Sequence, residues 1–509
     1  MSRQNFLTSR VFSAALSGME VKIIEVEISL SYGLPSFNIV GLPDKAVEES
    51  RERVISSLKN LKFSSPHKLP QKILVNLAPA DLRKSGSLYD LPIAISYLLA
   101  SEQIKFSPQK KIFIGELSLD GRLRPVNGVL PIAILAKEKG FEEIILPKEN
   151  AKEASLAGEE IKVIGIETLR EGIDFLEKRK NIIPTRNAFS LQEREYSIDI
   201  SFIKGQQTAK RALEIAAAGS HNILFLGPPG TGKSLLAKSL ISILPRLSFD
   251  ESLEVTKIYS IAGLLPKENP LITERPFRSP HHSCSEAALI GGGNPPRPGE
   301  ITLAHRGVLF LDELPEFRRD ALESLRQPLE EGEITISRAR YSFKFPAKFM
   351  LVAAANPCPT EGYGFTDLPC TPAQRLKYQR KLSGPLMDRI DLFVDVLPVK
   401  YKKLVGQEGE ESKKVKERVE RARKIQEERL REEEKKTNSE MEIPQIKKYC
   451  QIDSKSHQLL QRMVDSQRLS ARGYHRVLKV ARTIADLEGK EKIASDHVAE
   501  ALMYRLREG

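Results

Sequence analysis

The segment Asn222-Ile-Leu-Phe-Leu-Gly-Pro-Pro-Gly-Thr-Gly-Lys-Ser234 is the most informative stretch of this chain. Residues 223–226 are apolar, as in a buried strand, and residues 235–244 have the apolar spacing of a helix. The glycine-rich loop between them allows backbone N–H groups to point at phosphate oxygens, and the helix amino terminus adds partial positive charge. The order of strand, loop and helix therefore predicts a nucleotide-binding α/β fold.

Two side chains of this loop suit a nucleoside triphosphate and its metal ion. Lys233 can reach the β and γ phosphates, and the hydroxyl of Ser234 can ligate Mg²⁺. ATP and Mg²⁺ are therefore the expected cofactors. The predicted nucleotide-binding residues are Gly227, Pro228, Pro229, Gly230, Thr231, Gly232, Lys233 and Ser234.

Two later apolar runs end in polar side chains that could complete this site. Val308–Leu311 is followed by Asp312, which can hold Mg²⁺, and by Glu313, which can orient the attacking water as a general base. An edge strand that ends in solvated acids is the alternative. Phe349–Ala355 ends at Asn356, which a parallel sheet would place beside the γ phosphate. A turn-forming Asn before the following proline is the alternative there.

Three arginines in the second half of the chain are candidates for contact with a phosphate. Arg389 stands just before another apolar strand, and Arg472 and Arg476 lie one turn apart on the same side of a predicted helix. A guanidinium suits this task because it is planar and permanently charged. On the residues alone, a surface ion pair is the alternative for each arginine.

The chain divides into regions of different pattern. Residues 1–177 alternate strand-like and helical runs, which predicts an α/β domain, and residues 178–199 are polar and read as a linker. Residues 200–399 predict an open parallel sheet with helices on both faces. Residues 400–509 contain few glycines and prolines and predict a helical domain. Its charged stretch, residues 411–436, predicts a solvated helix rather than a nucleic-acid-binding arm.

Composition limits the class of protein. The 509 residues are 40% hydrophobic and 29% charged, as in a protein with several packed cores, and the net charge of +12 favours a polyanionic partner such as DNA. No apolar run approaches the roughly 20 residues that a bilayer span needs, and the first residues do not read as a secretory signal. The 4 cysteines are scattered. A cytoplasmic protein with no membrane partner is expected.

Several segments spread along the chain match the motifs of one family. They are Lys204–Gly219, the phosphate-binding loop, Arg275–Ser283, Gly307–Leu314 and Ala481–Leu487. On these segments the chain resembles the YifB/ComM family of magnesium-chelatase-like AAA+ ATPases, and the third region corresponds to the helical lid of that family.

The resemblance also implies roles for individual residues. Asn356 corresponds to sensor 1, Arg389 to the arginine finger that acts across a subunit boundary, and Arg472 to sensor 2. An arginine finger implies a ring, and a homo-hexamer is expected. The implied catalytic residues are Lys233, Asp312, Glu313, Asn356, Arg389 and Arg472.

The family further resembles magnesium chelatase motor subunits and MCM helicases, which carry a hairpin before sensor 1. Residues 333–345 alternate as a hairpin should. Arg338, Arg340 and Lys344 would then line a ring pore and contact DNA phosphates. A structural hairpin with solvated basic side chains is the alternative.

The amino-terminal region resembles the proteolytic domain of Lon in Leu77–Asp81, Gly115–Gly121 and Leu146–Asn150. Lon cleaves peptides with a Ser-Lys pair. Leu88 stands at the position of the serine and Leu130 at that of the lysine. Without a nucleophile or a base, no peptidase activity is expected.

Many relatives have four cysteines after sensor 1, with a spacing that suits zinc. The residues at these positions here are Cys358, Thr360, Leu368 and Cys370. Two thiolates do not complete a tetrahedral site, so no zinc is expected. His281 and His282 are expected to be structural rather than metal ligands.

These features predict an ATP-hydrolysing ring that moves along DNA, with branch migration or helicase activity in recombination or natural transformation. The alternative is a chelatase-like motor that remodels a metal-insertion partner. The Lon-like region disfavours this alternative, because chelatase motor subunits resemble only the later regions. A protease or a passive scaffold is a third possibility, which Leu88 and Leu130 and the complete set of ATP-site residues disfavour.

Overall fold

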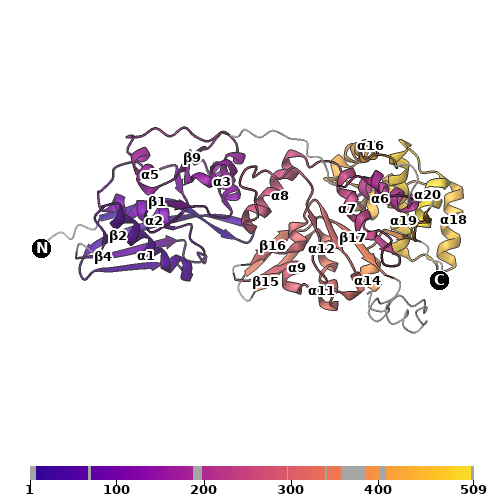
Figure 1. The fold of residues 1–509 in the computed structure, drawn as a ribbon, viewed down its shortest axis with the longest axis horizontal. Coiled ribbons are helices and arrows are strands. Elements are labelled where there is room, and N and C mark those ends of the chain that lie inside the picture. The colour runs from indigo at the N-terminus through magenta and orange to yellow at the C-terminus, as the bar shows by residue number, and fades with distance from the viewer. Residues whose placement is uncertain are drawn as a thin grey trace.

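The molecule has three regions that follow one another along its long axis (Figure 1). A sheet domain with the amino terminus lies at one end, a parallel sheet lies in the middle, and a group of helices lies at the other end. The computed structural model describes residues 7–66, 70–186, 198–294, 296–338, 341–356, 384–401 and 409–505. The predicted α/β fold class is confirmed.

The amino-terminal sheet contains both parallel and antiparallel strands. Its described strands have the order β3-β4-β2-β1-β5-β8-β9, in which β1, β2 and β4 pair antiparallel and the other pairs are parallel. The strands are β1 (Leu7–Ser17), β2 (Glu20–Tyr32), β3 (Ser36–Val40), β4 (Gln71–Ala78), β5 (Lys111–Phe113), β8 (Glu143–Pro147) and β9 (Lys162–Ile166). The helices of this region include α1 (Lys45–Asn60), α2 (Asp90–Ala100), α3 (Val129–Glu138), α4 (Ala151–Ala154) and α5 (Leu169–Leu176).

Strand β1 was not predicted from the sequence. Its residues pair with β2 along their whole length, from Leu7 opposite Leu30 to Ser17 opposite Glu20. The polar residues among its apolar ones obscure the strand pattern. The strand forms because Val11, Ala14 and Ala15 enter the core of this region.

The central sheet is parallel throughout its described strands, in the order β11-β14-β17-β10-β18. Its strands are β11 (Phe277–Arg278), β14 (Val308–Leu311), β17 (Met350–Ala355), β10 (Ile223–Leu226) and β18 (Leu392–Asp395). Along β10, Ile223 and Phe225 enter one hydrophobic cluster and Leu224 enters another. This alternation shows that both faces of the sheet are covered, as predicted.

Helices of the central region supply these two layers. One cluster includes residues of α6 (Gln207–Gly219) and α7 (Lys233–Ile243), and the other includes residues of α9 (Glu286–Ile290) and α11 (Arg319–Ser324). Helix α8 (Phe249–Ala262) lies between the central sheet and the amino-terminal region (Figure 1). There the N–H of Gly128 donates to the carbonyl of Ser260 at 3.0 Å, so the two regions are in direct contact.

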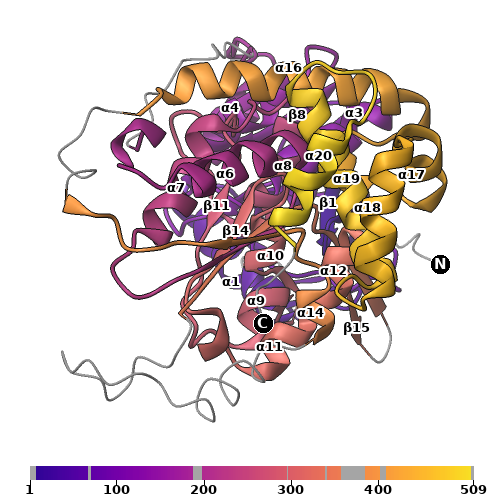
Figure 2. The same cartoon turned by 90° about the vertical axis from the view of Figure 1, so that its right-hand side faces the viewer.

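The carboxyl-terminal region is helical, as predicted, and faces the viewer in Figure 2. Its helices are α16 (Ser412–Leu430), α17 (Ile443–Tyr449), α18 (Ser454–Asp465), α19 (Ala471–Leu487) and α20 (Ser495–Met503). The prediction of a solvated helix at residues 411–436 is wrong on one face. Val415, Val419, Ala422 and Leu430 of α16 are buried in the same cluster as residues of α6 and α19, so the lid and the central region share a core.

The predicted hairpin is present. Strand β15 (Glu333–Arg338) pairs antiparallel with β16 (Tyr341–Pro346). Lys344 donates from Nζ to Oε1 of Glu333 at 2.7 Å. Arg340 and the side chain of Arg338 lie outside the described residues. A Cβ at Gly18 would lie 3.0 Å from the Phe343 ring, so the hairpin packs against the turn between β1 and β2.

None of the helices in the described part of the chain is long and apolar enough to cross a membrane.

Candidate nucleotide site

The phosphate-binding loop joins β10 to α7 and has the geometry of an anion cradle. A Cβ at Gly227 would lie 2.1 Å from the carbonyl oxygen of Val396, so only glycine fits there. Gly232 precedes α7 with a φ of 89°, a left-handed conformation that favours glycine. No side chain of the described residues caps α7. Its first N–H groups and its partial positive charge are therefore directed at the space above the loop, which fits a triphosphate.

Lys233 is held at the base of this loop. Its side chain is buried, with 7% exposure, and Nζ donates to the carbonyls of Gly227 and Pro228 at 2.7 Å each. Nζ also donates to Oδ1 of Asn356 at 2.9 Å. Burial lowers the pKa of Lys233, while the charges of Asp312 and Glu313 act in the opposite direction. The ammonium group is thus held by neutral acceptors. The phosphate oxygens of a nucleotide could replace these acceptors.

Ser234 and Asp312 meet at the start of α7. The Ser234 hydroxyl donates to Oδ2 of Asp312 at 2.6 Å, although 78 residues separate them in the sequence. A hydroxyl and a carboxylate oxygen are ligands that Mg²⁺ accepts. In the described part of the chain, no group of three or more His, Cys, Asp and Glu side chains could hold a metal ion. Phosphate oxygens and water would therefore complete the coordination, as is usual for Mg²⁺.

Glu313 follows Asp312 in an uncommon backbone conformation. Its φ is 51°, a value that few residues other than glycine adopt. Its N–H donates to Oδ1 of Asp312 at 3.0 Å, and the side chain is 47% exposed. Nδ1 of His282 lies 3.4 Å from Oε2 of Glu313. The sequence did not reveal this contact, although the histidine lies in one of the segments that carry the family resemblance.

Arg389 lies at the opposite edge of the central sheet from the phosphate-binding loop. Strands β10 and β18 are parallel, with Ile223 opposite Leu392 and Leu226 opposite Asp395. The loop follows the end of β10, whereas Arg389 precedes the start of β18. The length of a four-residue strand, about 13 Å, therefore separates the two edges. A single chain does not bring Arg389 to its own Lys233.

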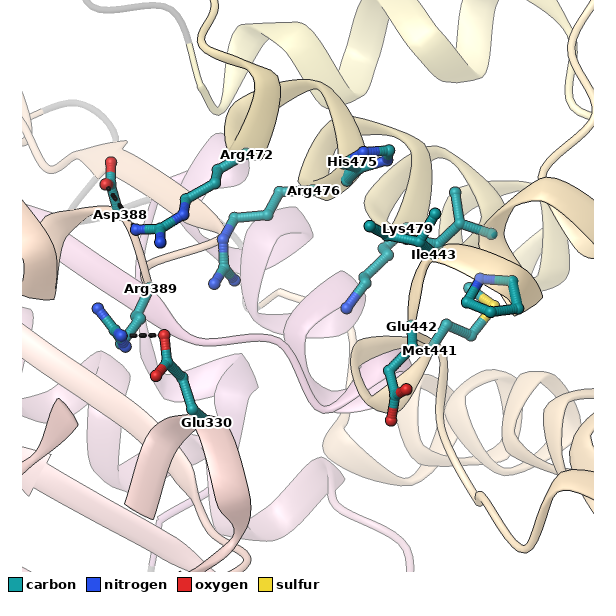
Figure 3. A pocket seen from close by; sticks show the side chains of 12 residues that line it. Glu330, Asp388, Arg389, Met441, Glu442, Ile443, Arg472, His475, Arg476 and Lys479 are labelled. Carbon is teal, nitrogen blue, oxygen red and sulfur yellow. Dashed lines mark hydrogen bonds and ion pairs between the residues drawn. The ribbon is translucent and has the colours of Figure 1, made fainter. Parts of the chain in front are cut away.

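Arg389 lines a cavity of about 450 Å³ between the central region and the lid (Figure 3). Its side chain is buried and forms an ion pair with Glu330. Burial lowers the pKa of Arg389. Glu330 counters this effect, and the nearby charges of Arg326, Arg472 and Arg476 lower the pKa further. Basic and acidic side chains line this cavity together, among them Arg472, Arg476 and Lys479 and the carboxylates of Asp388 and Glu442.

Arg472 belongs to the same cavity. Figure 3 shows Arg472 and Arg476 reaching from α19 toward Arg389, which lies just before β18. Nη1 of Arg472 lies 3.5 Å from Oδ2 of Asp388, and Arg476 pairs with Asp391. The structure therefore brings the predicted sensor 2 arginine to the predicted finger. It does not bring either one to the phosphate-binding loop of the same chain.

Asp391 anchors this edge of the sheet, a role that no pattern in the sequence indicated. Its buried Oδ2 accepts the backbone N–H of Asn222 at 2.9 Å, and its carboxylate pairs with Arg476. Burial alone would raise the pKa of Asp391, but the charge of Arg476 and the nearby imidazole of His221 hold it below its usual value. The charged carboxylate thus fixes the start of β18 to helix α19 of the lid.

Two further predictions concern residues away from this site. Leu88 and Leu130 are buried apolar side chains in the amino-terminal region. Cys358, Thr360, Leu368 and Cys370 lie outside the described residues, so the structure does not bear on the predicted lack of zinc.

Comparison with known proteins identifies the family. Residues 199–404 match the family model described as magnesium chelatase, subunit ChlI, residues 26–150 match subunit ChlI of Mg-chelatase, and residues 409–505 match the ChlI carboxyl-terminal model. Competence protein ComM of Haemophilus influenzae is 46% identical over 507 residues, which cover 97% of each chain. Uncharacterized protein YifB of Escherichia coli is 43% identical over 502 residues, which cover 98% of this chain and 97% of YifB.

Similarity to chelatase subunits themselves is more limited. The magnesium-chelatase 38 kDa subunit of Rhodobacter capsulatus is 27% identical over 175 residues, which cover 31% of this chain and 49% of that subunit. The relatives that match over nearly their whole length show instead that this chain belongs to the YifB/ComM family of magnesium-chelatase-like AAA+ ATPases.

Proposed function

We propose that this protein is an ATP-hydrolysing motor that forms a homo-hexameric ring and moves along DNA, with branch migration or helicase activity in recombination or natural transformation. The observation that carries the proposal is the position of Arg389 at the opposite edge of the central sheet from Lys233. The two residues can serve one nucleotide only if a second copy of the chain supplies one of them.

A composite site of this kind assigns roles to both copies. One subunit provides the phosphate-binding loop, Ser234 and Asp312 for Mg²⁺, Glu313 as general base and Asn356 as the γ-phosphate sensor. The next subunit provides Arg389 to neutralise charge in the transition state. Arg472 shares the cavity of Arg389, so we propose that it reaches the same neighbouring nucleotide. A contact between unlike surfaces of identical subunits closes into a ring when the rotation allows it.

Charge and family membership support DNA as the partner. The net charge of +12 favours binding to a phosphate backbone through release of counterions. The near full-length relative in Haemophilus influenzae is named a competence protein, which supports a role in natural transformation. On the hairpin, Lys344 is exposed and held only by Glu333 among the described contacts, so it is available to a phosphate. We propose that Arg338 and Arg340 of the same hairpin would contact phosphates as well.

ATPase measurement with different DNA structures tests the proposal. Turnover is measured without DNA and with single-stranded, duplex and four-way-junction DNA, at about 50 and about 200 mM salt. We expect DNA to raise turnover at the lower salt concentration and less at the higher one. Electron microscopy of the same samples should show rings. ATP hydrolysis without any DNA binding or stimulation would contradict the DNA part and leave the ATPase part standing.

A chelatase-like motor is the second candidate, because all three matching family models are described as parts of a magnesium chelatase subunit. The chelatase subunit of Rhodobacter capsulatus, however, matches only 31% of this chain. ATPase activity that responds to a metal-insertion partner and not to DNA would favour this candidate.

We also propose the division of the chain that its sequence suggests. Residues 1–177 would be a Lon-like module that binds or assembles without proteolysis, residues 178–199 a linker, residues 200–399 the ATPase core and residues 400–509 the lid. The buried leucines at positions 88 and 130 support the lack of peptidase activity. A peptidase assay, limited proteolysis and zinc analysis of the purified cytoplasmic protein test these points.

A further inference from the structure

The hairpin of β15 and β16 has one apolar face and one polar face. Ile334 pairs with Phe345 near the central region, and Ile336 pairs with Phe343 nearer the tip. These four side chains belong to or pack against one hydrophobic cluster, whereas Lys344 is exposed on the other face. Among the described strands the hairpin forms a sheet of its own, and a two-stranded sheet is marginally stable in water. Its position therefore depends on what covers its apolar face.

The amino-terminal region covers the part of this face that lies nearer the tip. Its turn between β1 and β2 consists of Gly18 and Met19, since Ser17 and Glu20 are the last paired residues. Gly18 is buried and lies directly against the ring of Phe343, and Met19 packs against the same cluster as the hairpin. In Figure 1 the hairpin lies on the side of the central region that faces the amino-terminal region. The end of the long β1–β2 pair thus abuts the hairpin.

A second contact joins the amino-terminal region to the same surroundings. Another short hairpin is formed by β12 (Gly291–Gly292) and β13 (Arg297–Pro298). A Cβ at Gly291 would lie 3.4 Å from Cδ1 of Ile336, so this short hairpin lies against β15. Nη1 of Arg83, in the amino-terminal region, lies 3.5 Å from Oδ1 of Asn294, which lies between β12 and β13. The amino-terminal region therefore touches both hairpins.

The turn of Gly18 and Met19 is anchored by a separate contact with helix α8. Close to the turn, Leu16 packs on Gly128, where an added Cβ would lie 2.2 Å from Cδ1 of Leu16. The N–H of Gly128 donates to the carbonyl of Ser260 in α8 at 3.0 Å, and the Ser260 hydroxyl donates to the buried carboxylate of Glu153. The turn is thus fixed to the central region without the help of the hairpin.

Apolar packing adds to this joint. Leu130 and Leu156 of the amino-terminal region form a buried cluster with Leu271 of the central region, and Leu253 of α8 packs against it. Leu130 stands at the position that the resemblance to Lon gives to the lysine. A position that would carry the base of a protease is therefore used here for contact between two regions.

We propose that the amino-terminal region is a brace that holds the hairpin of β15 and β16 in the position from which Lys344 meets a phosphate backbone. This inference rests on the proposed DNA motor and gives the Lon-like region a task other than proteolysis. Met19 is a positioning residue, because it packs against the cluster that carries the hairpin. Without the brace, DNA binding would have to order the outer half of the hairpin at a cost in conformational entropy.

Two substitutions of Met19 in the full-length protein separate the brace from the turn itself. Met19→Ser removes the apolar side chain but keeps a turn sequence, since Gly followed by Ser is typical of two-residue hairpin turns. Met19→Leu keeps an apolar side chain of similar volume. We expect Met19→Ser to weaken binding of a fluorescent DNA duplex about fivefold, the effect of losing a half-buried methionine side chain. Met19→Leu should bind within about twofold of the wild type, and ATP turnover without DNA should stay within about twofold in both variants.

Hydrogen exchange of residues 333–346 reports on the brace without DNA. The amides of this segment should exchange about fivefold faster in Met19→Ser than in the wild type. In a Phe343→Ala background, Met19→Ser should add little, because both substitutions remove the same packing. Leu7→Ser changes an exposed residue at the far end of β1 and is the matched control, which should alter neither exchange nor DNA binding.

Unchanged exchange or unchanged DNA affinity in Met19→Ser would overturn the inference. A fall in turnover without DNA as large as the fall in DNA affinity would overturn it too, since the turn would then act on the ATPase core as a whole. A wild type that binds no DNA would instead contradict the DNA part of the proposed function. In that case faster exchange in Met19→Ser would support the brace, and unchanged exchange would overturn it as well.

Discussion

The central sheet has a carboxyl edge, where its parallel strands end, and an amino edge, where they begin. These two edges hold their charged groups in contrasting ways. At the carboxyl edge the polar groups satisfy one another, because Lys233 is bound by Asn356 and by loop carbonyls and Ser234 is bound by Asp312. At the amino edge, arginines are paired with carboxylates instead: Arg389 with Glu330, Arg472 with Asp388 and Arg476 with Asp391. The carboxyl edge can hold a nucleotide and a metal ion, while the amino edge offers positive charge without a phosphate-binding loop. In the proposed ring, each edge would supply half of a hydrolytic site.

Removing the base of the carboxyl edge should have the largest effect. Glu313→Gln keeps the size of the side chain but cannot accept a proton from water. We expect kcat for ATP hydrolysis to fall by about 10³-fold, within the range for general bases, and ATP affinity to be retained. Turnover assays and a nucleotide-binding assay measure the two quantities. A fall of less than about tenfold would show that another group activates the water.

Removing the cation of the amino edge should have the next largest effect. Arg389→Ala should lower kcat by about 10²-fold or more, since arginine fingers contribute strongly to phosphoryl transfer. Affinity for ATP should change little, because the residue lies away from the binding loop of its own chain. Arg389→Lys should not restore activity, as an ammonium lacks the planar fork. Replacement of the exposed Arg10 by Ala is a matched control. A large loss of ATP affinity in Arg389→Ala would contradict the separation of the two edges.

Replacing Lys233, which lies at the carboxyl edge, should affect the binding of ATP instead. Lys233→Ala removes a charged donor to phosphate, and we expect ATP affinity to fall about 10- to 100-fold. Titration with a fluorescent ATP analogue in the presence of Mg²⁺ measures this change. Unaltered affinity would place the nucleotide elsewhere in the molecule.

The smallest effect should come from the anchor of the amino edge. Asp391→Asn leaves Arg476 without its charged partner, and we expect unfolding free energy at pH 7 to fall by about 2 kcal/mol. The pKa of Asp391 is lowered in the folded state, so its stabilising contribution is complete above the unfolded value of about 3.9 and is lost as the pH falls below it. The variant should therefore lose less stability than the wild type on acidification.

Urea denaturation between pH 7 and pH 3 measures this difference, with exposed Asp496→Asn as the control. Equal stability of Asp391→Asn and the wild type at pH 7 would show that the lid is held to the sheet without this carboxylate.

The parts of the site that the sequence revealed are local in the chain. The phosphate-binding loop and the strands that end at Asp312 and Asn356 are each recognisable from a few consecutive residues, because apolar runs and glycines have fixed consequences for the backbone. Strands β10, β14, β17 and β18 lie where the apolar runs predicted strands, whereas the short β11 was not predicted. The buried stripe of α16 was missed because its charged residues dominate the composition, while a residue every third or fourth position is enough to fill a core.

The contacts that the sequence could not reveal join distant segments. His282 meets Glu313 only because β11 lies beside β14, and Asp391 meets Arg476 only because α19 of the lid packs over the start of β18. The meeting of Arg389 with Arg472 has the same origin. Neither periodicity nor spacing encodes such neighbours, which depend on strand order and on the docking of the lid.

Mixing two impaired variants tests most directly whether the edges of two chains form one site. Lys233→Ala has an intact amino edge, and Arg389→Ala has an intact carboxyl edge. In a mixed ring, some boundaries combine the two intact edges, so we predict ATP turnover well above that of either variant alone, with a maximum near equal proportions. Turnover that only averages the two variants at every ratio would contradict a site shared between subunits.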